Sequence, residues 1–398
     1  MRYLFIILSL CVSVAQAETQ QTFAEWLQEL KADAVREGVS KKTVDATFKQ
    51  AKLLPRVIQL DRSQPEFIST FLDYLNQRVN TNLVEHGRNL MTQHQPLLTE
   101  VEARYGVPKQ VLVAFWGMET HYGKVQGDFD LASALMTLAY EGRRAVFFRN
   151  ELFNLMRIVD ARHMRPSAHS RVARIQGSWA GAMGHMQFMP STFLAYGVDA
   201  NHDGRVDIWK SLPDAIYSAA NYLSTVGWHS DEPIMVQVDL PADFDYRFAQ
   251  LNNRQPVDDW RKLGVIVPNH IPNLAHAAIL LPQGWRGPAL MVFSNFDVVM
   301  DWNRSVNYAL AVAYLSEQLV GVADIAVADE VELGALSFNE MWALQGKLNE
   351  LGFPSGPPDG FPGLKTQEAI RLYQAAHGLP QDGYASPSLY VRLVESLK

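Results

Sequence analysis

The sequence predicts a mainly α-helical protein with one small strand-containing insertion and a small separate domain at its C-terminus. Apolar residues recur at helical spacing near the N-terminus, as in residues 23–30. Between residues 233 and 294, Pro, Asp and Asn instead separate short strand-like segments. An acidic, small-residue-rich linker at residues 326–336 sets residues 337–398 apart from the rest of the chain.

Composition limits the possible partners. The chain has 398 residues, which is enough for two or three domains. Its composition, 48% hydrophobic and 19% charged, is ordinary for a soluble globular protein. The formal net charge is −7 and no basic stripe is present, so we expect no nucleic-acid partner.

The first residues have the pattern of a secretory signal peptide. Arg2 precedes an apolar run over residues 4–12, and a small-x-small site ends at Ala17. We expect cleavage after Ala17 and a periplasmic mature protein; the alternative is an uncleaved anchor. Cys11, the only cysteine, lies inside this leader. A mature chain without a thiol excludes cysteine catalysis and thiolate metal sites.

Helices are expected through most of the remaining chain. Residues 22–105 have helical patterns, which continue over residues 70–90. Gly106 and Pro108 indicate the end of one helix and the start of the next. The helix over residues 108–120 is apolar nearly all round and should be buried.

The later elements follow the same reasoning. Helices are expected over residues 131–226, interrupted by Gly-rich turns at 177–184 and 197–204, and again over 305–319, 339–351 and 365–377. Strands are expected at 235–238 and 289–293.

The first motif with chemical meaning is the segment 117–123, which contains Glu119. A carboxylate at the end of an apolar helix is poorly solvated, so its pKa should rise and leave it protonated near neutral pH. A general acid at a glycosidic oxygen needs this property. The motif alone does not distinguish such an acid from an ordinary solvent-facing glutamate.

The second motif is the segment 178–190, which is dense in Gly and Ala. Small residues would let the backbone approach a bulky ligand, and Ser178 and Gln187 could bind neutral sugar groups. The alternative is a tight turn that leads into a helix after Pro190.

Two further segments follow these two motifs: Asn221-Tyr222-Leu223, and Trp302-Asn303 followed by Asn307-Tyr308. All four occur in the order seen in the lytic murein transglycosylase B family. The sequence resembles that family over most of residues 22–320. The resemblance implies a lysozyme-like helical catalytic domain, here residues 18–325, whose insertion corresponds to about 233–294. It also implies non-hydrolytic cleavage of the β-1,4 bond between N-acetylmuramic acid and N-acetylglucosamine, which leaves a 1,6-anhydro-muramic end.

By the same resemblance, Glu119 acts first as acid and then as base. The residues that match substrate-contact or Glu-supporting positions are Ser178, Gln187, Tyr222, Asn303 and Tyr308. The chain departs from the family at Trp302, where a tyrosine is common, and at His185-Met186, where the type sequence has Met-Gly.

A third motif, at residues 199–207, has the D-x-N-x-D-G core of an EF-hand loop. Lys210 stands at the twelfth position and cannot bind a cation. In the family a later Asp completes the site, and the implied ligands are Asp199, Asn201, Asp203, Arg205 and Asp214. The loop is therefore expected to bind a structural Ca²⁺, and the alternative is a plain Asp/Asn/Gly turn. The chemical reaction itself is expected to require no cofactor.

Residues 337–398 resemble the three-helix peptidoglycan-binding module, with repeated Asp-Gly steps that favour turns. The expected partner is therefore the peptidoglycan glycan strand, with possible association with cell-wall synthesis or division proteins, and the chain is expected to be a monomer. Two other functions stay open: a lysozyme-type hydrolase, in which water replaces the internal nucleophile, and a non-catalytic wall-binding scaffold. The motifs supply no second carboxylate for the hydrolase, and an intact Glu119 argues against the scaffold.

Overall fold

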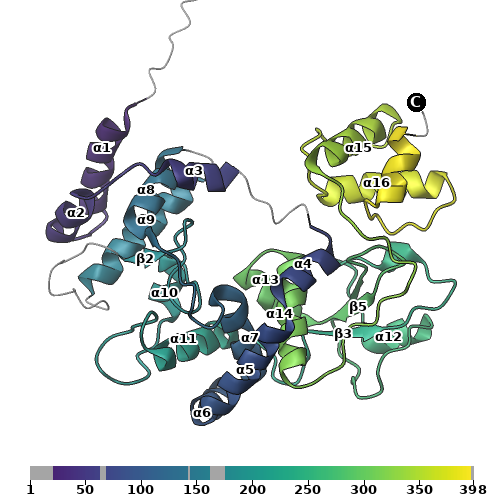
Figure 1. Cartoon of the computed structure of the whole chain (residues 1–398), viewed down its shortest axis with the longest axis horizontal. Helices are drawn as coiled ribbons and strands as arrows, with labels where there is room; N and C mark the ends of the chain where they lie inside the picture. The colour runs from purple at the N-terminus through teal and green to yellow at the C-terminus, as the bar shows by residue number, and fades with distance from the viewer. Residues whose placement is uncertain (1–20, 63–68, 142–143, 162–174, 396–398) are drawn as a thin grey trace, which may run out of the picture.

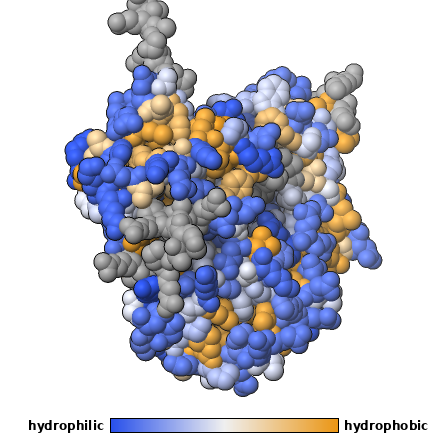
Figure 2. Space-filling view, turned by 60° about the vertical axis from the view of Figure 1, so that its left-hand side comes forward, coloured by the Kyte–Doolittle hydropathy of each residue, from blue (hydrophilic) through white to orange (hydrophobic). Residues whose placement is uncertain are grey.

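A computed structural model of the chain describes residues 21–62, 69–141, 144–161 and 175–395, and is drawn in Figure 1. The expected leader, residues 1–17, lies outside the described residues. Helices dominate the described chain, as the sequence predicts. Among the described residues, no helix is long and apolar enough to cross a membrane. One face of the molecule, shown in Figure 2, carries scattered hydrophobic patches among hydrophilic residues.

The main body contains the helices of the first four fifths of the chain, apart from the insertion. They are α1 (Phe23–Arg36), α2 (Lys41–Phe48), α3 (Pro55–Arg62), α4 (Phe71–Arg78), α5 (Thr81–Gln93), α6 (Gln95–Tyr105), α7 (Lys109–Thr120), α8 (Leu131–Glu141), α9 (Ala145–Asp160), α10 (Pro190–Tyr196), α11 (Leu212–Thr225), α13 (Ser294–Trp302) and α14 (Val306–Leu319).

The helical pattern of residues 70–90 forms two helices, α4 and α5. Val79 takes an extended conformation, and the Asn80 side chain accepts the backbone N–H of Leu83 at 3.0 Å, which starts a new helix. An N-cap of this kind satisfies a backbone donor that has no partner within the helix.

A three-stranded antiparallel sheet forms the centre of the insertion. Its strands, in the order β3 (Met235–Val238), β5 (Ala289–Val292) and β4 (Ala278–Leu280), include one that the sequence analysis missed, β4. Alternate residues of β5 face opposite sides: Leu290 and Val292 join the main core, whereas Ala289 and Met291 join the insertion's own core with Trp260 of α12 (Val257–Lys262). The sheet therefore fixes the insertion rigidly onto the helical body.

The C-terminal unit packs α15 (Phe338–Glu350) against α16 (Leu364–Ala376), followed by α17 (Pro387–Tyr390) and a π-helical turn over Val391–Glu395. Two buried glutamines hold its Asp-Gly turns. The Gln345 side-chain oxygen accepts the N–H groups of Asp359 and Gly360, both at 2.9 Å. The Gln374 side-chain oxygen likewise accepts the N–H of Gly383 at 3.0 Å, and the Gln374 amide nitrogen donates to Asp382 at 2.6 Å.

The segment that joins this unit to the main body lies against the insertion. The Gln237 side chain of β3 exchanges two hydrogen bonds with the backbone of Ala326, at 2.8 and 2.9 Å. Farther along, Gln283 donates to the carbonyl of Glu332 at 2.8 Å. In Figure 1 the C-terminal unit therefore stands beside the insertion, on the side away from α1 and α2.

Gln345→Ala should loosen the C-terminal unit. The substitution leaves the backbone N–H groups of Asp359 and Gly360 without their acceptor, at a cost of roughly 2 kcal/mol or more. Hydrogen exchange measured on the full chain should become faster in α15 and α16 and stay unchanged in α7. Gln367→Ala, which removes only one exposed bond to the Pro362 carbonyl, is the control. Unchanged protection in Gln345→Ala would contradict the structural role given to Gln345.

Candidate active site

Glu119 occupies the last turn of α7, a helix that is buried along almost its whole length. The helix packs against α5 and α14. Its side chain is only partly accessible to solvent. The structure therefore gives Glu119 the apolar setting that the sequence predicts.

Two aromatic donors hold the same oxygen of the Glu119 carboxyl. The indole Nε1 of Trp302, at the end of α13, donates to Oε1 at 2.9 Å. The hydroxyl of Tyr308, in the first turn of α14, donates to Oε1 as well. Among the described residues, none donates to the other oxygen, Oε2. One carboxyl oxygen is thus fixed, and the other is left to carry or accept a proton.

Burial raises the pKa of Glu119 to about 7. The hydrogen bonds from Tyr308 and Trp302 and the charge of Arg78 oppose this rise, because each stabilises the carboxylate. Near neutral pH the group is balanced between its acid and its base form. Burial and the neighbouring Glu119 also raise the pKa of Tyr308 well above its usual range, so the phenol remains a donor.

Several bonds fix the end of α7 that carries Glu119. The Thr120 hydroxyl accepts the N–H of Gly123 at 2.9 Å and donates to the carbonyl of His185 at 2.8 Å. The Trp116 indole donates to Nδ1 of His185 at 2.9 Å. Burial lowers the pKa of His185, which favours the neutral ring that can accept this bond. His185 therefore connects the Gly-rich segment to α7.

Tyr122 gives the same end a second anchor. His121 and Tyr122 both have left-handed backbone angles, with φ of 49° and 62°. The Tyr122 hydroxyl donates to the carbonyl of Leu83 in α5 at 2.9 Å. A Cβ at Gly117 would lie 2.9 Å from the Tyr122 ring, so only glycine leaves room for the ring there.

A cluster of aromatic rings surrounds Trp302. Its ring centre lies 4.5 Å from that of Phe115, 5.2 Å from Phe188 and 5.1 Å from Tyr222. These rings come from α7, the Gly-rich segment and α11. Trp302 is thereby held in the orientation that presents its N–H to Glu119. In the sequence, Trp302 stands out only as a departure from the family, and its contact with the acid was not predicted.

The residues predicted to bind substrate differ in how they relate to Glu119. Tyr308 contacts Glu119 directly, and Tyr222 packs edge to face against Trp302, where burial raises the pKa of Tyr222 to about 12. Asn303 is exposed just beyond α13. Ser178 and Gln187 make their hydrogen bonds mainly within their own segment: Ser178 Oγ accepts from Ala180 and Ala182, and Gln187 donates to the carbonyls of Gly184 and Gln126.

The small residues in segment 178–190 have close neighbours within the protein itself. Met183 and Phe188 pair across a tight turn, and α10 starts at Pro190, as the alternative interpretation proposed. A Cβ at Gly184 would lie 2.5 Å from the carbonyl oxygen of Ile208, and one at Gly181 would lie 2.5 Å from Leu135. Gly181 and Gly184 therefore permit close packing of the protein on itself, and the approach of this segment to a ligand stays a prediction.

In the 199–207 loop, side-chain oxygens accept backbone N–H groups. Asp199 accepts from Asp203 at 3.2 Å and Gly204 at 2.8 Å. The fully buried Asp214 accepts from Ala200 at 3.1 Å and Asp207 at 2.8 Å, which joins the loop to α11. Among the described residues, no group of three or more His, Cys, Asp or Glu side chains is arranged to hold a metal ion. The same oxygen-rich side chains are nevertheless of the type that Ca²⁺ prefers.

Comparison with known proteins agrees with this geometry. Residues 22–317 match the transglycosylase SLT domain family, and residues 339–393 match the family described as putative peptidoglycan binding domain. The chain is 28% identical over 303 residues to the membrane-bound lytic murein transglycosylase B of Escherichia coli (strain K12). That alignment covers 71% of this chain and 79% of the relative.

Solved structures give the same family. A crystal structure of SltB3 from Pseudomonas aeruginosa in complex with NAG-anhNAM-pentapeptide has a TM-score of 0.88 and 38% identity, and covers 94% of this chain and 99% of that one. The Escherichia coli lytic transglycosylase Slt35 in complex with calcium has a TM-score of 0.64 and 27% identity, and covers 74% of this chain and 92% of that one. The chain therefore belongs to the transglycosylase SLT domain family, whose members found here are lytic transglycosylases, enzymes that cleave peptidoglycan.

Proposed function

We propose that this protein is a lytic murein transglycosylase in which Glu119 is the only acid and base. It cleaves the β-1,4 bond between N-acetylmuramic acid and N-acetylglucosamine and leaves a 1,6-anhydro-muramic end. The observation that carries this assignment is the partly buried Glu119, whose pKa is raised to about 7 while two aromatic donors fix its Oε1.

The reaction balances with one proton carrier. Glu119 in its acid form donates a proton to the glycosidic oxygen as the bond from C1 of the muramic sugar breaks. The resulting carboxylate then takes the proton from the C6 hydroxyl of the same sugar, and O6 forms the new bond to C1. The enzyme ends in its starting protonation state, and no water is consumed.

The surroundings of Glu119 favour this reaction over hydrolysis. Ordinary glycosidases pair two carboxyl groups. A nearby second carboxylate would raise the pKa of Glu119 by charge repulsion. Among the described residues, the causes of the shift are burial, two hydrogen bonds and Arg78, with no acidic side chain. Asp301 precedes Trp302, but its charge acts on Tyr222 and Asp297 instead.

The contact residues fit subsites around Glu119. Exposed Asn303 and the Tyr222 hydroxyl have unused hydrogen-bonding capacity among the described residues. Ser178 keeps its hydroxyl proton for a ligand because its oxygen only accepts bonds in the turn. The amide nitrogen of Gln187 is occupied, so its side-chain oxygen is the group left for substrate. Tyr308 acts on Glu119 itself.

Glu119→Gln should abolish clearing of purified sacculi while binding is retained. The amide has nearly the same shape but cannot cycle a proton, and loss of a general acid costs at least about 100-fold in rate. Mass spectrometry of the wild-type digest should show anhydro-muramic ends. Glu85→Gln, an exposed change on α5, is the control. Reducing muramic ends, heavier by one water, would contradict the proposed reaction, and clearing by Glu119→Gln would contradict the assignment of the acid.

The pH dependence of kcat/KM should report the pKa of Glu119. Because the first step needs the protonated acid, kcat/KM on a soluble glycan fragment should fall as pH rises through about 7. Trp302→Phe removes a donor that stabilises the carboxylate, so the pKa rises and the fall should move to higher pH. Tyr222→Phe keeps the ring contact with Trp302 and should leave the midpoint in place. A midpoint that stays fixed or moves down in Trp302→Phe would be inconsistent with this role.

We also propose that the 199–207 loop takes up a structural Ca²⁺. Its ligands would be Asp199, Asn201, Asp203, the Arg205 position and Asp214, all on one loop and the helix start that follows it. Their donor chemistry fits, because a carboxylate oxygen that accepts one backbone N–H can still bind a hard cation. The calcium complex of Slt35 supports the proposal by similarity.

Millimolar Ca²⁺ added to chelator-treated protein should raise the melting temperature. A ligand present at 100 times its Kd stabilises the folded state by about 2.7 kcal/mol. Asp203→Ala removes one proposed ligand from an exposed position and should abolish the shift without lowering the starting melting temperature much. An equal shift in both proteins would place the cation elsewhere, and no shift in the wild type would leave the loop as a plain turn.

We further propose export to the periplasm with cleavage after Ala17, and function as a monomer. The signal pattern of residues 1–17 supports export. The expected associations with cell-wall synthesis or division proteins stay predictions.

A further inference from the structure

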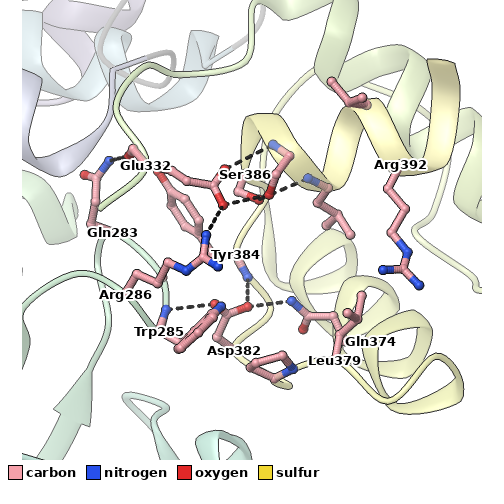
Figure 3. Close-up of a pocket in the computed structure, with 15 residues that line it drawn as sticks. Gln283, Trp285, Arg286, Glu332, Gln374, Leu379, Asp382, Tyr384, Ser386 and Arg392 are labelled. Carbon is pink, nitrogen blue, oxygen red and sulfur yellow. Dashed lines mark hydrogen bonds and ion pairs between the residues drawn. The ribbon is translucent and has the colours of Figure 1, made fainter. Parts of the chain in front are cut away.

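A cavity of about 420 Å³ lies between the insertion and the C-terminal unit. One wall is the loop over residues 283–286, between β4 and β5. The opposite wall comes from residues 374–392, which include parts of α16, α17 and the π-helical turn, and from Glu332 of the linker; Figure 3 draws the lining side chains. The volume falls within the range of about 300–1,000 Å³ that is usual for sites of small ligands.

Direct contacts hold the two walls in place. The backbone N–H of Trp285 donates to Oδ2 of Asp382 at 2.9 Å. The Ser388 hydroxyl and N–H donate to Glu332 at 2.6 and 3.0 Å. A Cβ at Gly284 would lie 2.9 Å from the Tyr384 ring, so the backbone approaches that ring closely. The cavity is therefore preformed by the docking of the two units.

The charges around the cavity are not balanced. Its two carboxylates are already used: Glu332 is bound by Ser388 and lies 3.6 Å from Arg286, and Asp382 accepts bonds from Trp285, Gln374 and Tyr384. Arg392, by contrast, is exposed at the rim and has no hydrogen bond or ion pair with any described residue. Among the described residues, the unpaired charge at the cavity is thus positive.

The remaining lining suits short aliphatic groups. The Trp285 ring is 40% exposed, with the Arg286 guanidinium stacked 4.8 Å from its centre. Leu379 and Val391 add apolar surface. The Arg392 guanidinium at the rim and this apolar surface on the walls together match a ligand that combines a carboxylate with small alkyl side chains.

We propose that this cavity binds the peptide portion of peptidoglycan, with Arg392 pairing a peptide carboxylate and Trp285 packing on its alkyl groups. The inference rests on the proposed function, which makes peptidoglycan the substrate. Within that polymer the free carboxylates belong to the peptides, because the lactyl carboxyl of each substituted muramic sugar is used in the amide bond to its peptide. Binding here would engage both the insertion and the C-terminal unit.

The test is calorimetric titration of the full chain with a sugar-free stem tetrapeptide. The wild type should bind it, and Arg392→Gln should weaken binding at least tenfold, equivalent to about 1.4 kcal/mol. Arg392→Lys keeps the charge and should fall between the two. Lys365→Gln removes an exposed cation of the same unit outside the cavity and should bind as the wild type does.

Absence of binding to the wild type, or equal binding by Arg392→Gln, would overturn the proposal. A peptide-free glycan whose binding is weakened by Arg392→Gln would also overturn it, by assigning the cavity to sugar. The proposed function is tested separately, by the anhydro ends that the wild type forms from peptide-free glycan. If that reaction failed, the titration would still show whether the cavity binds the peptide.

Discussion

The desolvated carboxyl group of Glu119 is the constraint on which the site depends. Water would keep such a group ionised near neutral pH, whereas burial at the end of α7 raises its pKa to about 7. Trp302 and Tyr308 partly oppose that rise and hold one oxygen in place. The balance between burial and these two donors gives one residue both the acid and the base form that the reaction needs.

The fold can be understood as support for that carboxyl group. Helices α13 and α14 bring Trp302 and Tyr308 from the far end of the main body to α7. Thr120 and His185 tie the end of α7 to the Gly-rich segment. Tyr122 ties it to α5. A catalytic group must be held within small tolerances, and these bonds remove the freedom of a helix end, where chains usually fray.

Much of this arrangement could be predicted from the sequence, and the failures have physical reasons. The apolar run of α7 identified a buried helix, and Glu119 stood out at its end. The Trp302 contact could not be found, because nothing in a sequence fixes which side of an indole meets a residue so far along the chain. The glycines at 181 and 184 suggested a ligand, and their close neighbours within the protein, Leu135 and Ile208, were not predicted. The boundary at Val79 was not predicted, because the helical pattern continues across the Asn80 cap.

The pKa of Glu119 is the most direct measurement of the central claim. Difference infrared spectroscopy between the wild type and Glu119→Gln isolates the carboxyl band of this one residue across a pH series. The account predicts a midpoint near 7, which rises in Trp302→Phe. A midpoint of about 4.3, the usual pKa of an exposed glutamate, would mean that the carboxyl is not desolvated and would contradict the mechanism.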